Sequence, residues 1–383
     1  MSTPIQSYSL YKLEVPTGRL IGDNNCAYES LDLVCLRLET SSGDIGWGYG
    51  ECCWKGTFQK PAWYIRPMES LQALKDRFDA TIWPLLHQRS PGEALDGFSL
   101  EGTQAASLTY LETAVRTALW DLRAKEAGLP LYQLLRGDRE GPKVGKVKAY
   151  GSPLDFHLSD AAAVRKTQDF LEMGMQAIKV KIGATDGNRD VARLRLIRDA
   201  VPESVEITAD ANIAWTAAQT LERLEQFSKA GVTLGYLEDP LPPGDVEGFA
   251  ALAKARPDVP IVAHDYIAEP DQLRRILDTG ALSMIRLGKD VDYVRAGMKL
   301  AEEYGVGVIF GNSMFELNVH FACAFDGVDR LEFSDLAWNQ LLIEPVRFES
   351  GMAIAPSVPG HGLTPNPVML ERWKQPAGGE ARK

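Results

Sequence analysis

The segment AIKVKIGATDGNRDVARLRLIRDAVPESVEITADAN, residues 177–212, contains one complete strand, helix and strand. The runs AIKVKI (177–182) and VEITADAN (205–212) are short and mostly apolar, as buried parallel strands are. Between them, ATDGNRDVARLRLIRDAV has the pattern of a surface helix. Because parallel strands require a crossover connection of this kind, the segment indicates an α/β fold.

The same unit repeats along the chain at intervals of roughly 25 residues. Six further strand-like runs are KVKAYGS (146–152), GYLEDP (235–240), VPIVAHD (259–265), LSMIRLG (282–288), VGVIFGN (306–312) and RLEFSD (330–335). Eight buried runs separated by helices predict a (β/α)8-type barrel. A doubly wound open sheet is the alternative, but no GxGxxG follows the first run.

The first third of the chain has a different pattern. Residues 29–40 alternate apolar and polar side chains, residues 41–44 form a turn, and IGWGYGE (45–51) is again extended, which predicts an antiparallel hairpin. Apolar residues at spacings of three and four predict a helix over residues 106–128. Gly128 is expected to end that helix.

Composition limits the possible partners. The 383 residues include 41 Lys and Arg against 52 Asp and Glu, a net charge of −11, which argues against nucleic acid. No apolar run is long enough for a membrane span or a signal peptide, so we expect a cytoplasmic protein. The 5 cysteines lack CxxC spacing, and neither disulfides nor a zinc site are indicated. A small-molecule partner is therefore expected.

Charged residues interrupt the strand-like runs near their carboxyl ends, and an unpaired buried charge would cost several kcal/mol there. They are Lys179, Lys181, Asp210, Glu238, Asp265 and Arg286. The carboxyl ends of barrel strands are where active sites are built. These residues are therefore the candidate site.

The residue types suggest a chemistry. Lys179 and Lys181 are two residues apart, so both should point to the same side of their strand. Three carboxylates from consecutive strands would repel one another unless a cation held them, and oxygen ligands favour Mg2+, or Mn2+, over zinc. A lysine beside a second cation should have a lowered pKa and could act as a base. Removal of a proton next to a carboxylate, through a metal-stabilised enolate, is the reaction that such a site favours.

These motifs together resemble the enolase superfamily, in its mandelate racemase and muconate lactonizing enzyme branch. The resemblance rests on KVK, DAN, LEDP and HD in the family's order, on ETAVRTALWDLRAKEAGLPLYQLLRG (112–137), and on PSVPGHGL (356–363). It implies a modified (β/α)7β TIM barrel with an N-terminal α+β capping domain. The implied domains are residues 1–140 for the cap, 141–350 for the barrel, and 351–383 for a C-terminal segment that returns to the cap.

The resemblance also implies roles. Lys181 would be the general acid/base, and Lys179 would lower its pKa and meet the substrate carboxylate. The implied Mg2+ ligands are Asp210, Glu238 and Asp265, with Asn212 supporting them. Relatives of this kind assemble as homo-oligomers, so we expect one here.

One position departs from the family pattern. Arg286 stands where the muconate-type branch has a second catalytic lysine, and GNSM (311–314) lacks the histidine of the mandelate-type branch. Arginine is a poor base, so Arg286 would either bind the substrate carboxylate or neutralise an acid. One secure base favours dehydration of a hydroxy acid or sugar acid. Racemisation, epimerisation or cycloisomerisation would need a second base such as Lys289, and a binding protein without turnover is the remaining alternative.

Three further features carry weaker signals. Glu316 follows the seventh run and could contact substrate or cap a helix. Trp54 and the segment 17–28 belong to the expected capping domain, whose loops would close over the barrel, so they are candidates for substrate specificity. His320 lies in a helical pattern, where a packed or partly exposed histidine is expected rather than a catalyst.

Overall fold

The computed structural model describes residues 3–58, 68–100, 109–139, 144–263, 270–288 and 291–375. Its N-terminal part is a three-stranded antiparallel sheet of β1 (Ile5–Gly22), β2 (Cys26–Thr40) and β3 (Ile45–Phe58). The predicted hairpin is confirmed as β2 and β3, with Glu39 opposite Ile45. Strand β1 was not predicted. The interpretation of residues 17–28 as a loop is wrong, because only the turn between Gly22 and Cys26 lies outside the strands.

Helix α4 (Thr109–Glu126) lies directly against β3. A side chain at Gly48 would place its Cβ 1.8 Å from the carbonyl oxygen of Ala114, and one at Gly50 would lie 1.8 Å from that of Tyr110. The alternating glycines of GWGYG therefore allow this close approach. The other helical elements of this part are α1 (Leu71–Arg77), η1 (Phe78–Ile82), α2 (Trp83–Leu86), α3 (Pro91–Gly97) and α5 (Leu131–Arg136).

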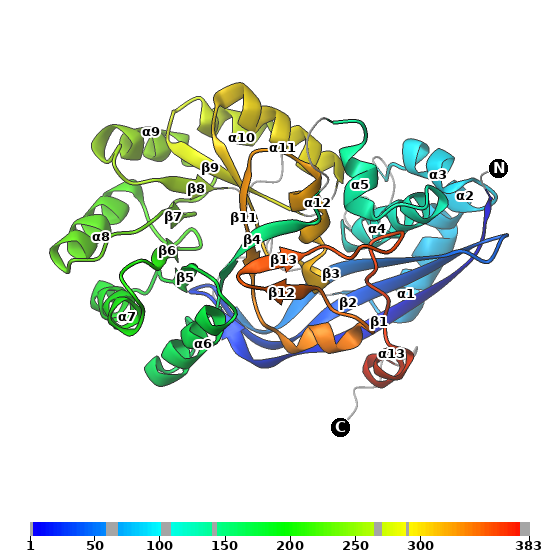
Figure 1. Ribbon diagram of the computed structural model, residues 1–383, viewed down its shortest axis with the longest axis horizontal. Coiled ribbons are helices and arrows are strands. Elements are labelled where there is room, and N and C mark those ends of the chain that lie inside the picture. Colours follow the sequence, from blue (N-terminus) through cyan, green and yellow to red (C-terminus); the bar gives the residue numbers. More distant parts are fainter. Residues whose placement is uncertain are drawn as a thin grey trace.

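The second part of the chain forms a closed parallel barrel, on the left in Figure 1. Its strands are β4 (Lys146–Gly151), β5 (Ala177–Lys181), β6 (Glu206–Asp210), β7 (Leu237–Glu238), β8 (Ile261–Ala263), β9 (Leu282–Leu287), β10 (Gly307–Phe310) and β11 (Val328–Phe333). All eight predicted runs are thus confirmed as strands. Leu331 of β11 pairs with Ala149 of β4 and closes the sheet, which excludes the open-sheet alternative.

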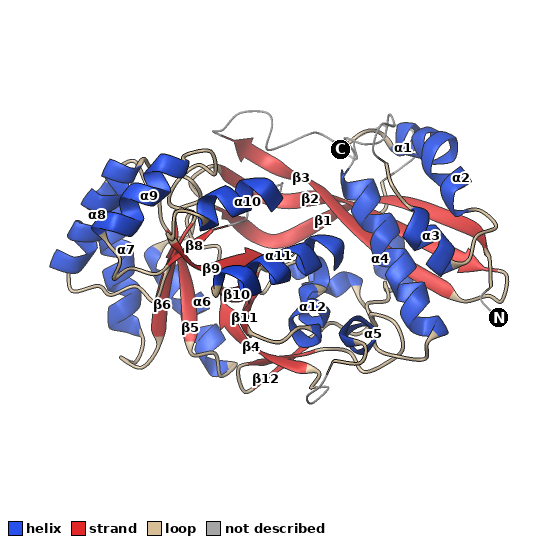
Figure 2. Cartoon of the chain, turned by 90° about the horizontal axis from the view of Figure 1, so that it is seen from above, coloured by secondary structure: helices blue, strands red, loops and turns tan. Residues whose placement is uncertain are grey.

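A helix follows each of the first seven barrel strands. These are α6 (Asp160–Glu172), α7 (Gly187–Ala200), α8 (Ala217–Lys229), α9 (Val246–Ala255), α10 (Pro270–Leu277), α11 (Val291–Tyr304) and α12 (Asn318–Ala324). Figure 2 shows α7, α8 and α9 on the outer side of the barrel strands. Short 3-10 turns η2 (Met314–Glu316) and η3 (Ala337–Leu341) follow β10 and β11. The (β/α)7β architecture is confirmed.

The C-terminal residues run from the barrel back along the N-terminal part. The hairpin of β12 (Arg347–Glu349) and β13 (Met352–Ile354) adds to β4 in the antiparallel direction. After α13 (Pro367–Trp373), Gln375 donates a hydrogen bond to Lys12 of β1. The domain boundaries near residues 140 and 350 remain predictions. Among the described residues, no helix combines the length and apolar character needed to cross a membrane.

Candidate active site at the barrel mouth

Lys179 and Lys181 both extend from β5 into the barrel. Lys179 is completely buried, and Lys181 is 7% exposed. Their ammonium groups meet the same oxygen, Oδ2 of Asp210, at 3.3 Å and 2.6 Å. The prediction that the two lysines share one side of the strand is confirmed, because alternate residues of a strand point the same way.

Asp210 and Glu238 end the neighbouring strands β6 and β7 and are paired in register. Both are fully buried. Lys179 donates to Oε1 and Oε2 of Glu238 at 3.0 Å and 3.2 Å. The two predicted metal ligands on described residues therefore lie together, with the Lys179 ammonium bridging them.

Arg286 of β9 is buried and paired with carboxylates. Its Nη2 donates to Oε2 of Glu332 at 2.8 Å, and its Nε lies 3.3 Å from Oε1 of Glu238. The other oxygen of Glu332 lies 3.0 Å from the Lys179 ammonium. Of the two roles considered for Arg286, these contacts support neutralisation of acids.

Glu332 was missed by the sequence analysis, although it is as buried as the residues that were found. The available signal was a lone acid inside the apolar run RLEF of the eighth strand. We call six of the buried charged residues at this end of the barrel, which contact one another, the mouth cluster: Lys179, Lys181, Asp210, Glu238, Arg286 and Glu332. It contains three cations and three carboxylates, so its formal charges balance when all six are ionised.

Burial and neighbouring charges act in opposite directions on these groups. Burial raises the pKa of Glu238 to about 7, helped by the nearby Asp210 and Glu332 carboxylates and opposed by Lys179. Burial lowers the pKa of Lys179, but three carboxylates overcome this and hold it well above its usual value. Lys179 is therefore a permanent cation among the protein's own groups.

Among the protein's own groups the pKa of Lys181 is raised; the predicted lowering, which relied on a metal ion beside the two lysines, stays a prediction. Burial and the Lys179 ammonium do lower it, but Asp210 at 2.6 Å raises it, and the net direction is upward. An opposite charge in contact outweighs a like charge farther away. The spacing of the lysines alone could not reveal this contact.

Asn212 joins the mouth cluster as predicted. Its side-chain oxygen accepts a hydrogen bond from Lys181 Nζ at 3.1 Å, and its backbone N–H donates to Asp210. Its carbonyl oxygen accepts from the Asn25 side chain at 2.8 Å. The turn between β1 and β2 is therefore fixed to the barrel mouth beside Lys181.

A second residue missed in the sequence, Asp155, positions the backbone of β5. Its Oδ1 accepts from the Lys181 N–H at 2.9 Å, and its Oδ2 accepts from Arg193 Nη1 at 2.9 Å. Asp155 follows the first barrel strand, whose carboxyl end the sequence analysis left without a candidate. Asp155 fixes the backbone of Lys181, and its other carboxylate oxygen pairs with Arg193 rather than with the mouth cluster.

Some predicted residues are not brought together by the described structure. Asp265 and Lys289 lie outside the described residues, and of Trp54 only the backbone strand is described. Glu316 is buried beside Asn339 and Asp335, and burial raises its pKa to about 8. No contact with the mouth cluster is recorded for Glu316 within the described chain, and its predicted contact with substrate remains a prediction.

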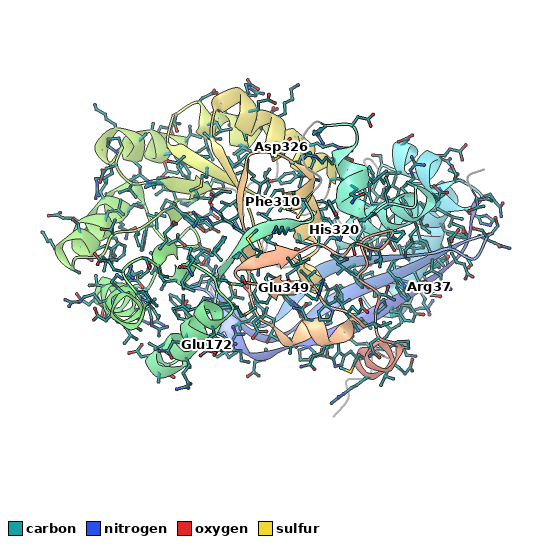
Figure 3. All side chains as sticks on the ribbon, viewed as in Figure 1. Arg37, Glu172, Phe310, His320, Asp326 and Glu349 are labelled. Carbon is teal, nitrogen blue, oxygen red and sulfur yellow. The ribbon has the colours of Figure 1, made fainter. Side chains whose placement is uncertain are left out.

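His320 is packed inside the molecule where α12 meets α5, as expected from its helical pattern (Figure 3). Its Nδ1 accepts from the Tyr132 N–H, which leaves Nε2 to donate to the His361 carbonyl oxygen at 2.8 Å. The Nδ1 of His361 likewise accepts a hydrogen bond, from the Leu363 N–H. Asp121 accepts from the His361 N–H at 2.9 Å. We call Asp121, His320 and His361 the junction cluster.

The mouth cluster supplies only two of the three predicted ligands of a divalent cation. Asp210 and Glu238 supply buried oxygen donors on adjacent strands, the type that Mg2+ prefers. Among the described residues, no group of three His, Cys, Asp or Glu side chains has the arrangement of a metal site. The third predicted ligand, Asp265, is not among them.

Comparison with known proteins gives the family. Residues 26–136 match the mandelate racemase / muconate lactonizing enzyme N-terminal domain, and residues 162–369 match the enolase C-terminal domain-like family. The chain is similar to L-Ala-D/L-Glu epimerase of Bacillus subtilis, with 26% identity over 86% of this chain and 88% of that protein. It is also similar to arabinonate dehydratase of Saccharolobus solfataricus (27%, covering 91% and 92%) and muconate cycloisomerase 1 of Rhodococcus opacus (27%, covering 94% and 96%).

Solved structures agree. A putative mandelate racemase from Mesorhizobium loti has a TM-score of 0.86 and 30% identity, covering 97% of this chain and 95% of that one. L-Talarate dehydratase from Polaromonas sp. JS666, crystallised with Mg and L-glucarate, has a TM-score of 0.79 at 24% identity, covering 98% of each chain. Two matching domains and this shared architecture show that the chain belongs to the mandelate racemase / muconate lactonizing enzyme family of the enolase superfamily.

Proposed function

We propose that this protein is a Mg2+-dependent enzyme that removes the proton α to a carboxylate, with Lys181 as the base, and that its reaction is dehydration of a hydroxy acid or sugar acid. Mn2+ is an alternative cation. Asp210 and Glu238, together with Asp265, would hold the metal. When bound, the cation would stabilise the negative charge that develops on the substrate carboxylate.

The observation that supports this choice of reaction is the pairing of Arg286 with two carboxylates. Its guanidinium contacts Glu332 and Glu238 at 2.8 Å and 3.3 Å, and an arginine in such contacts stays protonated. It therefore cannot accept a proton from the face opposite Lys181. Lys179 lies on the same side of β5 as Lys181, so it does not offer a base on the opposite face either.

A single lysine suffices for dehydration. Neutral Lys181 takes the α-proton, and the C–H electron pair passes into the substrate's enolate. The enolate then expels the β-hydroxyl, to which the Lys181 ammonium returns the proton. A C–H and a C–O bond break, a C=C bond forms, water leaves, and Lys181 is neutral again. Asn212 would orient Lys181 throughout, since its oxygen already accepts from Nζ.

Epimerisation and cycloisomerisation remain the competing reactions, because the similar proteins include an epimerase and a cycloisomerase. The test is to incubate hydroxy acids, sugar acids and dipeptides with the enzyme and Mg2+ in D2O. We expect loss of water from one acid class, with recovered substrate of unchanged configuration. Stereorandom α-deuteration of recovered substrate would instead establish two-base chemistry and reject the dehydratase.

A further inference from the structure

A cavity of about 590 Å3 lies between β1 and the barrel, outside the barrel wall. Its lining includes Thr17 and Arg19 from β1, Lys166 from α6, and Asp335 and Asn339 from the segment after β11. The volume is within the range of small-ligand sites, roughly 300–1,000 Å3. A molecule bound there would touch the N-terminal sheet and the barrel at the same time.

Side chains in β11 and just after its end separate this cavity from the mouth cluster. Glu332 points into the barrel and contacts Lys179, whereas Asp335, three residues later, points outward and pairs with Lys166 of α6 at 2.8 Å. Odd spacing along an extended chain places side chains on opposite sides. The cavity is therefore a different place from the proposed catalytic site.

Arg19 is the cation in this lining that makes no direct ion pair among the described residues, although the Asp335 carboxylate acts on it from farther away. Lys166 is shared by Asp335 and Asp169, at 2.8 Å and 3.0 Å. Within the described part of the chain, Arg19 has no carboxylate at ion-pair distance, and its buried Nε has no hydrogen-bond partner. Its Nη2 donates to the Pro153 carbonyl oxygen at 2.7 Å. Half-buried guanidinium groups are normally paired, so this one is suited to an incoming anion.

The other polar groups define what kind of anion fits. Asp335 lines the same cavity and would repel a highly charged ligand, but its carboxylate can accept a hydrogen bond from a hydroxyl group. Because Lys166 is already shared by Asp335 and Asp169, Arg19 is left to meet one negative charge, which matches a monoanion better than a phosphate dianion.

We propose that this cavity, which we call the junction cavity, is a binding site for a small monocarboxylate that also carries a hydroxyl group. Arg19 binds the carboxylate, and Asp335 accepts from the hydroxyl. The site is independent of the proposed reaction. Arg19 donates to the Pro153 carbonyl oxygen, and Asp155, two residues after Pro153, accepts from the Lys181 N–H. A molecule bound to Arg19 would therefore act on the segment that positions the proposed base.

The test is isothermal titration of the enzyme with sodium lactate, with acetate, phosphate and chloride at the same ionic strength. We expect lactate to bind more tightly than acetate, and chloride to give no saturable signal. An Arg19→Met variant should bind lactate at least about tenfold more weakly, the usual loss for a charged hydrogen-bonded pair. Phosphate binding more tightly than lactate would reject the proposed ligand class.

Two controls locate the binding. Arg347→Met removes an exposed arginine that pairs with Glu349, and it should leave lactate binding unchanged. Lys181→Met should also bind lactate normally, whatever its activity, so loss of binding in that variant would assign lactate to the barrel mouth and overturn the proposal. If Arg19→Met does not fold, two other variants test the site. Arg19→Lys keeps the charge but loses the fork of the guanidinium, and Lys166→Met leaves the negative charge of Asp335 unpaired. Each should weaken lactate binding. Unchanged binding in both would equally reject the site.

Discussion

The mouth cluster and the junction cluster are both buried groups of titratable side chains, but their partners differ. In the mouth cluster, charged side chains neutralise one another, as when Lys179 contacts Asp210, Glu238 and Glu332 at 3.0–3.3 Å. In the junction cluster, Asp121 pairs with Lys125 at 2.7 Å, but backbone groups satisfy both histidines, whose rings are neutral because each Nδ1 accepts an N–H bond.

This difference separates the proposed catalytic site from a structural cluster. Side-chain ion pairs can be exchanged for a substrate or a metal ion, because a new charge can replace an old one. Backbone hydrogen bonds cannot be exchanged without moving the chain. Burial and the presence of titratable residues are therefore common to both regions, and the identity of the partners distinguishes them.

Removal of the base should have the largest effect on activity. Lys181→Met should lower kcat by about 10^2- to 10^4-fold, the usual contribution of a general acid/base group. The measurement is the steady-state rate on whichever acid the D2O screen identifies. Lys229→Met, at a 73% exposed lysine, is the matched control and should retain the full rate. Full activity in Lys181→Met would reject the assignment of the base.

Removal of one carboxylate from the mouth cluster should have the largest effect on stability. Glu332→Gln leaves Lys179 and Arg286 without a shared counter-charge, and breaking a buried pair costs about 3–5 kcal/mol. Urea unfolding at neutral pH measures the loss. Glu349→Gln, at an exposed residue of β12, should cost almost nothing. Equal stability of the two variants would show that the mouth cluster does not depend on its internal charge balance.

Acid should weaken the junction cluster. Burial lowers the pKa of His320 from 6.5 to about 3, so the unfolded chain takes up a proton that the folded one refuses. The stabilising contribution is complete above pH 6.5 and is lost as the pH falls toward 3, at about 1.4 kcal/mol per pH unit. Burial lowers the pKa of His361 as well.

The measurement is urea unfolding at pH 7 and pH 5. His320→Gln keeps one donor and one acceptor. Between pH 7 and pH 5 its free energy of unfolding should fall by about 2 kcal/mol less than that of the unsubstituted protein. His87→Gln, at an exposed histidine, should show the unsubstituted pH dependence. An unchanged pH dependence in His320→Gln would mean that His320 is not kept neutral by its backbone partners.

The smallest predicted effect concerns the proposed cation. Lys179 occupies the space between Asp210 and Glu238, so it competes electrostatically with any metal ion held there. Lys179→Met should bind Mg2+ about tenfold more tightly by calorimetry, equivalent to roughly 1.4 kcal/mol, while its turnover falls. Weaker Mg2+ binding would instead show that Lys179 positions the carboxylates for the metal ion rather than competing with it.

Local pattern was sufficient for most of the barrel and for the charged residues at its mouth. The eight strand runs were found because buried parallel strands are short and apolar, and Lys179, Lys181, Asp210, Glu238 and Arg286 were found because charges are exceptional in such runs. Strand β1 was missed because its polar N-terminal half and its proline lack a regular alternation. Glu332 carries the same signal, an acid inside a buried strand run, but it was not singled out.

By itself, the sequence determined the repeated strand-and-helix order, and with it the end of the barrel where the charges gather. Only the tertiary structure decided how those charges pair. The contacts of Arg286 with Glu332 and of Lys181 with Asp210 join residues 46 and 29 positions apart. Coulomb energy depends on distance and burial rather than on spacing along the chain, so barrel closure was needed to show that Arg286 is neutralised and that the Lys181 pKa is raised.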